Sequence, residues 1–269
     1  MLVRSIPDTD HADAMGPYPL FVCSDWEQIG KDLEAHQDDW VSAAVVTDPL
    51  GASEEVLSRQ EFDVVRPFKP HYLIDLSIPY RDAVSSRHRE YARYARRNGV
   101  QTVRIEEPKS KLDTWIDLYD HLIDRHDITG IQAFSPASFE RQFEVPGLVM
   151  FFATYDGKPA AAHLWFEMGD VAYSHLVAHS AAGYESRSSY AIHQAAIKYF
   201  ESRVQWLNLG GGVGTSSEEK DGLSQFKSGW ATTSRSSFLC GRVLQPSVYD
   251  KLTATETNYF PAYRAGELV

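Results

Sequence analysis

The sequence predicts a mixed α/β (α+β) protein, and two observations carry that prediction. Three strand candidates, Val149–Tyr155, Pro159–Glu167 and Val171–His179, are separated by Asp156-Gly157 and Gly169-Asp170, which are strong signals for tight hairpin turns. A long helical pattern and another short apolar segment then follow in the chain. With 269 residues, of which 43% are hydrophobic, the chain can bury one large core or two smaller ones, and its length favours two units.

The first quarter of the chain is weakly patterned. Three short apolar segments are predicted to be strands: Leu20–Cys23, Val41–Thr47 and Tyr72–Leu76. Trp26–His36 has the spacing of an amphipathic helix, with Ser24 or Asp25 as its cap. The segment Asp48–Gln60 is acidic and rich in small residues, and we expect it to form a loop outside the core.

Helices and strands are predicted from several further patterns. Ser85–Asn98 is followed by Gly99, a residue type that favours helix C-termini. Lys111–Asp124 has apolar residues at helical spacing, and Ser135-Pro136 opens a short helix because serine supplies a cap oxygen and proline suits the first turn. The remaining predictions are the helix Ser186–Ser202 and the strands Trp206–Leu209 and Phe238–Val243.

Composition limits the possible classes of protein. The two cysteines, Cys23 and Cys240, cannot build a disulfide framework or a structural zinc site by themselves, and each lies in an apolar stretch that favours a small buried side chain. The N-terminal segment Met1–Met15 has acids and no apolar core, and the longest apolar runs, near Val41–Val46 and Leu148–Ala153, are far too short to span a bilayer. We therefore expect a soluble, cytoplasmic protein.

The formal net charge of −11 disfavours a broad nucleic-acid-binding surface, but the charge is unevenly spread. One predicted helix carries a group of arginines: Arg87, Arg89, Arg93, Arg96 and Arg97. Helical spacing places Arg89, Arg93 and Arg96 on one face. Two interpretations stay open. Either Arg93 and Arg96 contact an anionic partner such as tRNA, or the helix face is solvated and its arginines pair with the chain's many acids.

The stretch that ends at Lys227 is the strongest candidate for chemistry. An apolar strand runs into the glycine-rich segment Gly210–Gly214, and a short helix then carries Phe226 and Lys227, with Trp230 one turn further on. The aromatic neighbours indicate that this helix face is packed. A lysine held there can offset negative charge that develops on a reacting acyl group.

A plainer interpretation exists for each of these residues. Lys227 can be an ordinary surface lysine, and the glycines can mark only a sharp turn or bulge at the end of a strand. The glycine run matches neither a dinucleotide-binding nor a P-loop pattern. We expect Gly211, Gly212 and Phe226 to lie beside the bound substrate, with Lys227 as a catalytic residue.

The segment from Leu207 to Trp230 has the sequence LNLGGGVG…DGLSQFKSGW. It resembles the C-terminal signature of Fem-type (FemABX-like) peptidyltransferases, a branch of the GNAT superfamily. The resemblance implies a GNAT-like fold, with a C-terminal GNAT unit over residues 106–269 and a shortened N-terminal GNAT-like half over residues 1–105. It also implies an acyltransferase that moves an acyl or aminoacyl group from an activated ester to an amine of a small molecule or peptide. In such enzymes the matching lysine, here Lys227, lies at a substrate carbonyl.

The same resemblance implies where the acyl donor binds. Two neighbouring parallel strands, Val171–His179 and Trp206–Leu209, are expected to splay, and the opening holds the donor. Ordinary acetyltransferases of the superfamily follow the first of these strands with a pyrophosphate-binding loop, whose pattern is missing from residues 179–190. This departure favours aminoacyl-tRNA over acyl-CoA as the co-substrate, although Gly183 to Ser189 still offers backbone donors at the start of a helix. No bound cofactor is predicted.

Histidines supply a candidate general base. Strict alternation along Val171–His179 sends Tyr173, His175 and His179 to one face. If that face lines the opening, Tyr173 contacts the substrate and His175 accepts a proton from the attacking amine, because imidazole titrates near working pH. A buried histidine bonded to a backbone carbonyl is the plainer alternative. A metal cluster of His163 with His175 and His179 would need adjacent strands in one register, so no metal is predicted.

The acceptor side has one candidate segment. Arg66-Pro67-Phe68-Lys69-Pro70 places two cations in a rigid turn before a strand. It resembles a substrate-contacting position in the N-terminal half of Fem proteins, so Arg66 and Lys69 are candidate contacts, whereas the two prolines also suit a plain linker. A function from another class stays open as well, namely a catalytically silent binding module on the same fold.

Overall fold

The structure is a computed structural model that describes the whole chain except residues 18, 59, 213–221, 254–256 and 266–269. The chain forms two compact units: unit 1 is Met1–His71, Gly212–Lys220 and Arg235–Val269, and unit 2 is Tyr72–Gly211 and Asp221–Ser234. Strands β4 (Val64–Asp75) and β10 (Thr233–Val243) pass from one unit into the other. The compact units therefore do not divide at residue 105, and the shortened GNAT-like half over residues 1–105 stays a prediction.

Unit 1 is built on strands in the order β1-β2-β3-β10, with β1 (Leu2–Ser5), β2 (Ala12–Met15) and β3 (Ser42–Val46). The β1–β2 and β3–β10 pairs are antiparallel, whereas β2–β3 is parallel. The helices of this unit are α1 (Ile29–Glu34), α2 (Glu54–Ser58), α10 (Pro246–Leu252) and the 3-10 turn η3 (Ala262–Arg264). Apolar residues of β3 and β10 pack with those of α1 and α2 into one core.

Two predictions for unit 1 are wrong, and a third, the helix Trp26–His36, is present with a different start and without the predicted cap. Leu20–Cys23 is not a strand, because only Phe21 forms an isolated bridge, with Thr47. The helix predicted from Trp26 begins at Ile29, after a turn in which Asp25 Oδ1 accepts from the Glu27 N–H. The segment Asp48–Gln60 reaches the core, since it contains α2.

Two further details of unit 1 differ from the sequence-based expectation. Leu57 of α2 is fully buried, so the acidic segment anchors itself by its apolar residues rather than lying outside the core. Arg66 and Lys69 lie inside β4 and not in a turn. Proline is tolerated in a strand where its missing N–H is not needed for the ladder, which explains how Pro67 and Pro70 fit there.

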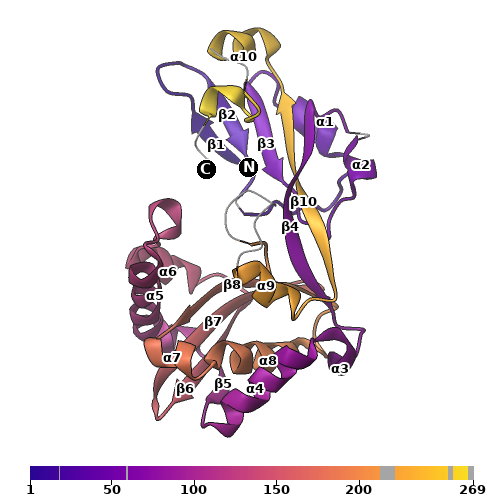
Figure 1. Cartoon of the computed structure of the whole chain (residues 1–269). Coiled ribbons are helices and arrows are strands. Elements are labelled where there is room, and N and C mark those ends of the chain that lie inside the picture. Colours follow the sequence, from indigo (N-terminus) through magenta and orange to yellow (C-terminus); the bar gives the residue numbers. More distant parts are fainter. Residues whose placement is uncertain (18, 59, 213–221, 254–256, 266–269) are drawn as a thin grey trace. The chain divides into compact units, whose positions relative to one another are not determined.

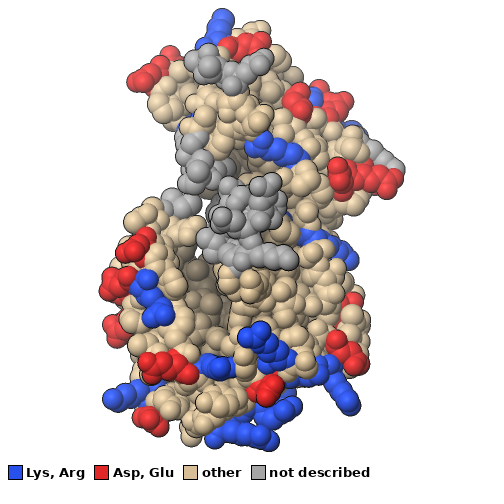
Figure 2. Space-filling view, viewed as in Figure 1, with Lys and Arg blue, Asp and Glu red and all other residues tan. Residues whose placement is uncertain are grey.

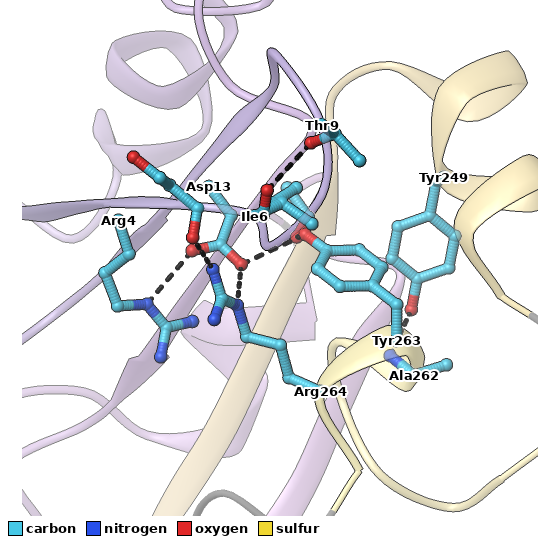
Figure 3. A network of polar contacts seen from close by, with 10 residues as sticks. Arg4, Ile6, Thr9, Asp13, Tyr249, Ala262, Tyr263 and Arg264 are labelled. Atoms are coloured by element: carbon cyan, nitrogen blue, oxygen red, sulfur yellow. Dashed lines mark hydrogen bonds and ion pairs between the residues drawn. The ribbon is translucent and has the colours of Figure 1, made fainter.

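A buried ion-pair network fastens the C-terminal segment to the β1–β2 hairpin within unit 1 (Figure 3). The Asp13 carboxylate is 1% exposed and accepts from Arg4 Nε at 3.0 Å, from Arg264 Nε at 2.5 Å and from the Tyr263 hydroxyl at 3.1 Å. Arg264 also donates to the Ser5 carbonyl at 2.7 Å. Charged groups this deeply buried are stable only because they are paired.

Unit 2 has strands in the order β4-β9-β8-β7-β6-β5. Its strands, besides the end of β4, are β5 (Gln101–Ile105), β6 (Leu148–Tyr155), β7 (Lys158–Met168), β8 (Val171–His179) and β9 (Trp206–Asn208). Its helices are α3 (Tyr80–Ala83), α4 (Ser86–Arg97), η1 (Pro108–Lys111), α5 (Leu112–His126), η2 (Gly130–Gln132), α6 (Pro136–Gln142), α7 (Ala181–Glu185), α8 (Ser188–Phe200) and α9 (Gly222–Ser228). The helices and strands predicted between residues 85 and 209 are present in the predicted order, but β5 and α7 were not predicted.

Helices cover both faces of the unit 2 sheet, with α4 and α8 on one face and α5 and α6 on the other (Figure 1). The period-2 alternation of β6 explains both layers: Phe151 packs towards α8, whereas Met150 packs towards α5. Trp165 and Phe200 are fully buried on the side of α8, and Trp115 is fully buried on the side of α5. The sheet is therefore held between two apolar layers.

Two irregularities of β8 matter for the site. The parallel β8–β9 ladder has three pairs, Val171↔Trp206, Ala172↔Leu207 and Tyr173↔Asn208, and β8 then continues to His179 after β9 has ended. The β7–β8 register shifts between Leu164 and Trp165, which pair with Leu176 and Ser174. His175 is therefore the extra residue of a bulge, and the residues after it point to the face opposite the one that strict alternation predicts.

Candidate active site

Lys227 lies on α9 and reaches back to the glycine turn that follows β9. Its side chain is half-buried, and its Nζ donates to the Gly211 carbonyl at 2.6 Å. A Cβ added to Gly210 would lie 3.2 Å from the same nitrogen. The predicted association of Lys227 with the glycine run is thus present in the structure, while Val213 and Gly214 lie outside the described residues.

The turn itself is fixed from two sides. The Asn208 Oδ1 accepts from the Gly210 N–H at 2.8 Å, and Gly210 has a φ of 75°, a region that favours glycine. On the β4 side, the Leu209 N–H donates to the Tyr72 carbonyl at 2.8 Å and the Tyr72 N–H donates to the Gly210 carbonyl at 3.1 Å. The backbone angle at this position therefore favours glycine, and a Cβ there would in addition press on the Lys227 ammonium.

Helix α9 is docked on the start of α4. The His88 ring is buried, and its Nε2 donates to the Phe226 carbonyl at 2.9 Å while Nδ1 lies 2.9 Å from Ser85 Oγ. The carbonyl can only accept, so Nε2 carries the proton. Gly229 packs directly on this ring, because an added Cβ would lie 2.0 Å from His88 Cε1. The backbone on both sides of Lys227 is therefore held by His88.

Buried neutral histidines lie next to Lys227. His163 is fully buried with its ring 4.5 Å from that of His193, and the pKa of His163 lies well below its usual value, first because of burial and then because of His193. Burial also lowers the pKa of His193 to about 3 and that of His179 to about 4. Lys227 contributes further to the lowering for His163 and His193. Lys227 is thus near enough to two buried histidines to affect their pKa values, and an electrostatic interaction with buried groups is stronger than one in water.

The structure separates His175 from this group of histidines. The bulge leaves His175 against α6, where its Nε2 lies 2.8 Å from Gln142 Oε1 and its ring packs on Phe134. Burial lowers the pKa of His175 to about 4, so it is neutral near pH 7. Tyr173 is half-buried and forms the last pair of the β8–β9 ladder. The base role of His175 and the substrate contact of Tyr173 stay predictions.

The loop after β8 differs from an open anion-binding loop. The Gly183 N–H donates to Ser180 Oγ at 3.2 Å and the Tyr184 N–H to the Ser180 carbonyl at 3.1 Å. A Cβ on Gly183 would lie 1.9 Å from the Ala160 carbonyl oxygen, so this glycine is needed for close packing on β7. The Arg187 and Tyr190 N–H groups also donate to backbone carbonyls. Several N–H groups between Gly183 and Arg187 are therefore already bonded within the chain, while donation to an anion from Ser188 and Ser189, at the start of α8, stays a prediction.

Arginines of α4 form an exposed basic face. Figure 2 shows Lys and Arg side chains over the region of α4 and α8. Within the described ranges, no ion pair involves Arg93, Arg96 or Arg97. Arg89 instead donates to the carbonyls of Arg81 and Val84, so it stabilises the end of α3. Arg93 and Arg96 therefore do not pair with acids among the described residues, which the second interpretation had expected them to do.

The other predicted contacts are divided between the units. Phe226 packs on the rings of Tyr190 and His193 in unit 2. Gly212, Arg66 and Lys69 belong to unit 1, where Arg66 donates to the Asn258 carbonyl and the Lys69 carbonyl accepts from Ser237 Oγ. Their contact with substrate stays a prediction.

Three residues of this region were not predicted from the sequence as parts of the site. Asn208 is a buried polar residue directly before the glycine turn, and His88 and His193 are buried among aromatic rings. A polar residue at the end of an apolar strand is a visible signal for Asn208. Nothing in the sequence marks His88 among its arginine neighbours as the residue that contacts α9.

Comparison with known proteins identifies the family. A family model described as an acetyltransferase (GNAT) domain matches residues 84–227, more than half of the chain. The chain belongs to the GNAT domain family. No curated protein matches the sequence. The GNAT chain is similar to the crystal structure of FemX, with a TM-score of 0.74 and 12% identity over 93% of this chain and 85% of that one.

Two further solved structures are also similar to this GNAT protein. The C-terminal domain of a candidate synthetase from Agrobacterium fabrum has a TM-score of 0.64 at 15% identity, over 89% of this chain and 80% of that one. The structure of L-PGS from Bacillus licheniformis has a TM-score of 0.59 at 14% identity, over 80% of this chain and 72% of that one. At such identities these likenesses concern the fold, and the resemblance to the Fem-type fold is confirmed at that level.

The GNAT family makes acyl transfer the reaction class of this protein. Among the described residues, no group of three or more His, Cys, Asp or Glu side chains could hold a metal ion. No helix within the described ranges has the length and apolar composition needed to cross a bilayer.

Proposed function

We propose that this GNAT protein transfers an aminoacyl group from an aminoacyl-tRNA to an amine acceptor, with Lys227 stabilising the oxyanion. The observation that carries the proposal is the position of Lys227. Its ammonium lies at the turn after β9, where the parallel β8–β9 ladder stops at Tyr173↔Asn208. A fixed cation at the point where two parallel strands part is suited to a carbonyl group that enters the opening.

The chemistry needs few protein groups. The neutral amine attacks the ester carbon of the donor, so that a C–N bond forms and the carbonyl oxygen becomes an oxyanion. The Lys227 ammonium stabilises this charge, and the turn that holds it requires no rearrangement during the reaction. The tetrahedral intermediate then collapses, the C–O bond to the ribose breaks, and the leaving hydroxyl takes up the proton that the amine loses. Positioning of the two substrates supplies much of the remaining rate.

The loop after β8 supports a tRNA donor over CoA. In that loop the N–H groups of Gly183, Tyr184, Arg187 and Tyr190 have partners within the protein, and Gly183 packs on β7. A pyrophosphate there would have to compete with those bonds. The second candidate, a CoA-dependent acetyltransferase, is favoured by the description of the matching family.

The basic face of α4 supports an anionic donor. Arg93 and Arg96 are exposed and make no ion pair with a described residue, although the chain has a net charge of −11. Tyr94 of the same helix has 51% of its surface accessible, and Arg187 lies over its ring at 5.4 Å. Exposed cations and an exposed aromatic ring on one helix suit the phosphates and unstacked bases of a single-stranded end.

A ligand-binding titration tests the donor. Thermal melts are recorded with increasing acyl-CoA and, separately, with a tRNA that carries a non-hydrolysable aminoacyl amide. We expect the tRNA ligand to raise the melting temperature in proportion to the logarithm of its concentration and acyl-CoA to leave it unchanged. A shift with acyl-CoA alone would favour the second candidate. Tight tRNA binding without transfer to any of a panel of amines would make the chain a binding module.

A further inference from the structure

We propose that Asn208 is a positioning residue for Lys227, acting through the turn whose carbonyl holds the ammonium. The effect of Asn208 on catalysis rests on the proposed function. Its effect on the position of Lys227 follows from the contacts of the turn alone. Asn208 itself is not placed at the reacting atoms. It fixes the Gly210 backbone, and Gly210 is followed at once by the Gly211 carbonyl that binds Lys227.

Asn208 occupies a constrained place in the sheet. It is 2% exposed and is the last residue of β9, in register with Leu73 of β4 on one side and Tyr173 of β8 on the other. Its backbone is therefore held by both neighbouring strands. A side chain at such a place has little freedom, so its amide oxygen is fixed before the turn begins.

The bond from Gly210 to Asn208 is the type that builds a local turn. An Asn oxygen that accepts from the N–H two residues later imitates a backbone turn and stabilises a left-handed residue there. Here the distance is 2.8 Å and Gly210 has a φ of 75°. Without that acceptor, the backbone bonds that tie Leu209 and Gly210 to described residues are the two with Tyr72, and both lie before Gly211 in the chain. The Gly211 carbonyl would then be free to turn away from Lys227.

A neutral acceptor also fits the charge at this site. A carboxylate at position 208 could accept from the same N–H, but it would bring a negative charge into the turn that holds the cation. An ion pair formed there would compete with an oxyanion for Lys227. An amide fixes the turn without this competition, as a serine hydroxyl can also do.

The test measures the chemical accessibility of Lys227 and needs no substrate. The protein is labelled to a small extent with acetic anhydride, and mass spectrometry gives the labelling of Lys227 relative to exposed Lys158 on β7. We expect Asn208→Ala to raise this ratio at least about threefold, because an amine released from its hydrogen bond is more often accessible and unprotonated. Asn208→Ser, which keeps a neutral acceptor, should stay near the wild-type ratio.

A second variant controls for the possibility that Asn208→Ala raises the labelling only because it destabilises the fold. Asn208→Leu keeps the number and branching of the side-chain heavy atoms and has no acceptor, so it should give the same rise as Asn208→Ala while filling the space. Circular dichroism and thermal melts of each variant establish that the protein is folded. An unchanged labelling ratio in either folded variant, or an equal rise in Asn208→Ser, would overturn the proposal.

Kinetics separate this inference from the proposed function. In a transfer assay, Asn208→Ala should lower kcat about tenfold with little change in KM, since a misplaced cation weakens only the transition state. Asn208→Ser should recover most of that loss. If the labelling ratio rises but kcat is unchanged, Asn208 does position Lys227 and it is the catalytic role of Lys227 that fails. If the ratio is unchanged, the positioning role fails whatever the activity.

Discussion

Replacing Lys227 by methionine should separate catalysis from stability. Methionine keeps an unbranched stem that can pack near Phe226 and Trp230, whose rings lie 6.1 Å apart. The change removes the hydrogen bond to the Gly211 carbonyl at 2.6 Å, and such a bond is worth about 1 kcal/mol to stability. In the transition state it removes the cation that faces the oxyanion, which costs about 3 kcal/mol, or about a hundredfold in rate.

Single-turnover transfer at saturating donor measures that loss, and thermal melts measure stability. We expect the Lys227→Met variant to melt within a few degrees of wild type and to transfer about a hundredfold more slowly. Lys198→Met is the matched control, because Lys198 is an exposed lysine on α8 in the same unit and should transfer at the wild-type rate. A Lys227→Met protein that is stable and transfers within a few-fold of wild type would refute the oxyanion role. Unfolding of this variant would make Lys227 structural.

Three further outcomes are expected. Charge reversal of Arg93 and Arg96 should weaken tRNA binding and flatten its dependence on salt, because fewer counterions are released; an unchanged slope in filter-binding titrations would make both residues ordinary surface arginines. Asp13→Asn should lower the free energy of unfolding by about 3 kcal/mol in urea titrations, because the buried Arg264 and the half-buried Arg4 lose their charge partner, and a loss below about 1 kcal/mol would contradict this. The pKa of His193 is lowered to about 3 by burial, so the unfolded state binds its proton first on acidification. Stability should therefore fall as the pH drops from about 6.5 towards 3, and His193→Phe should flatten this fall.

Local chemistry explains which elements the sequence could predict. Asp156-Gly157 adopts positive φ values of 49° and 72°, and Gly99 ends α4 with a φ of 95°, so each turn follows from a residue type that tolerates that conformation. Ser135 caps its helix with its side-chain oxygen as expected, and Ser85 does the same for α4. These signals depend only on neighbours in the chain.

Long-range packing explains what the sequence could not predict. The β8 bulge at His175 arises from pairing with β7, and no local pattern distinguishes it from regular alternation. Leu57 lies in the acidic segment Asp48–Gln60, and its burial comes from packing in unit 1 that the local sequence does not indicate. The link from His88 to the Phe226 carbonyl joins residues 138 positions apart. Lys227 itself could be found, because the glycine turn and the aromatic residues lie close to it in sequence.

The most direct measurement of the proposed function is transfer from a labelled donor. Purified protein is incubated with radiolabelled aminoacyl-tRNA or with radiolabelled acyl-CoA, each with and without a panel of amines, and the label that passes to the amine is counted. We expect amine-dependent transfer from aminoacyl-tRNA that Lys227→Met reduces about a hundredfold and Lys198→Met leaves unchanged. Transfer from acyl-CoA with none from aminoacyl-tRNA, or transfer that is insensitive to the loss of Lys227, would contradict the proposal.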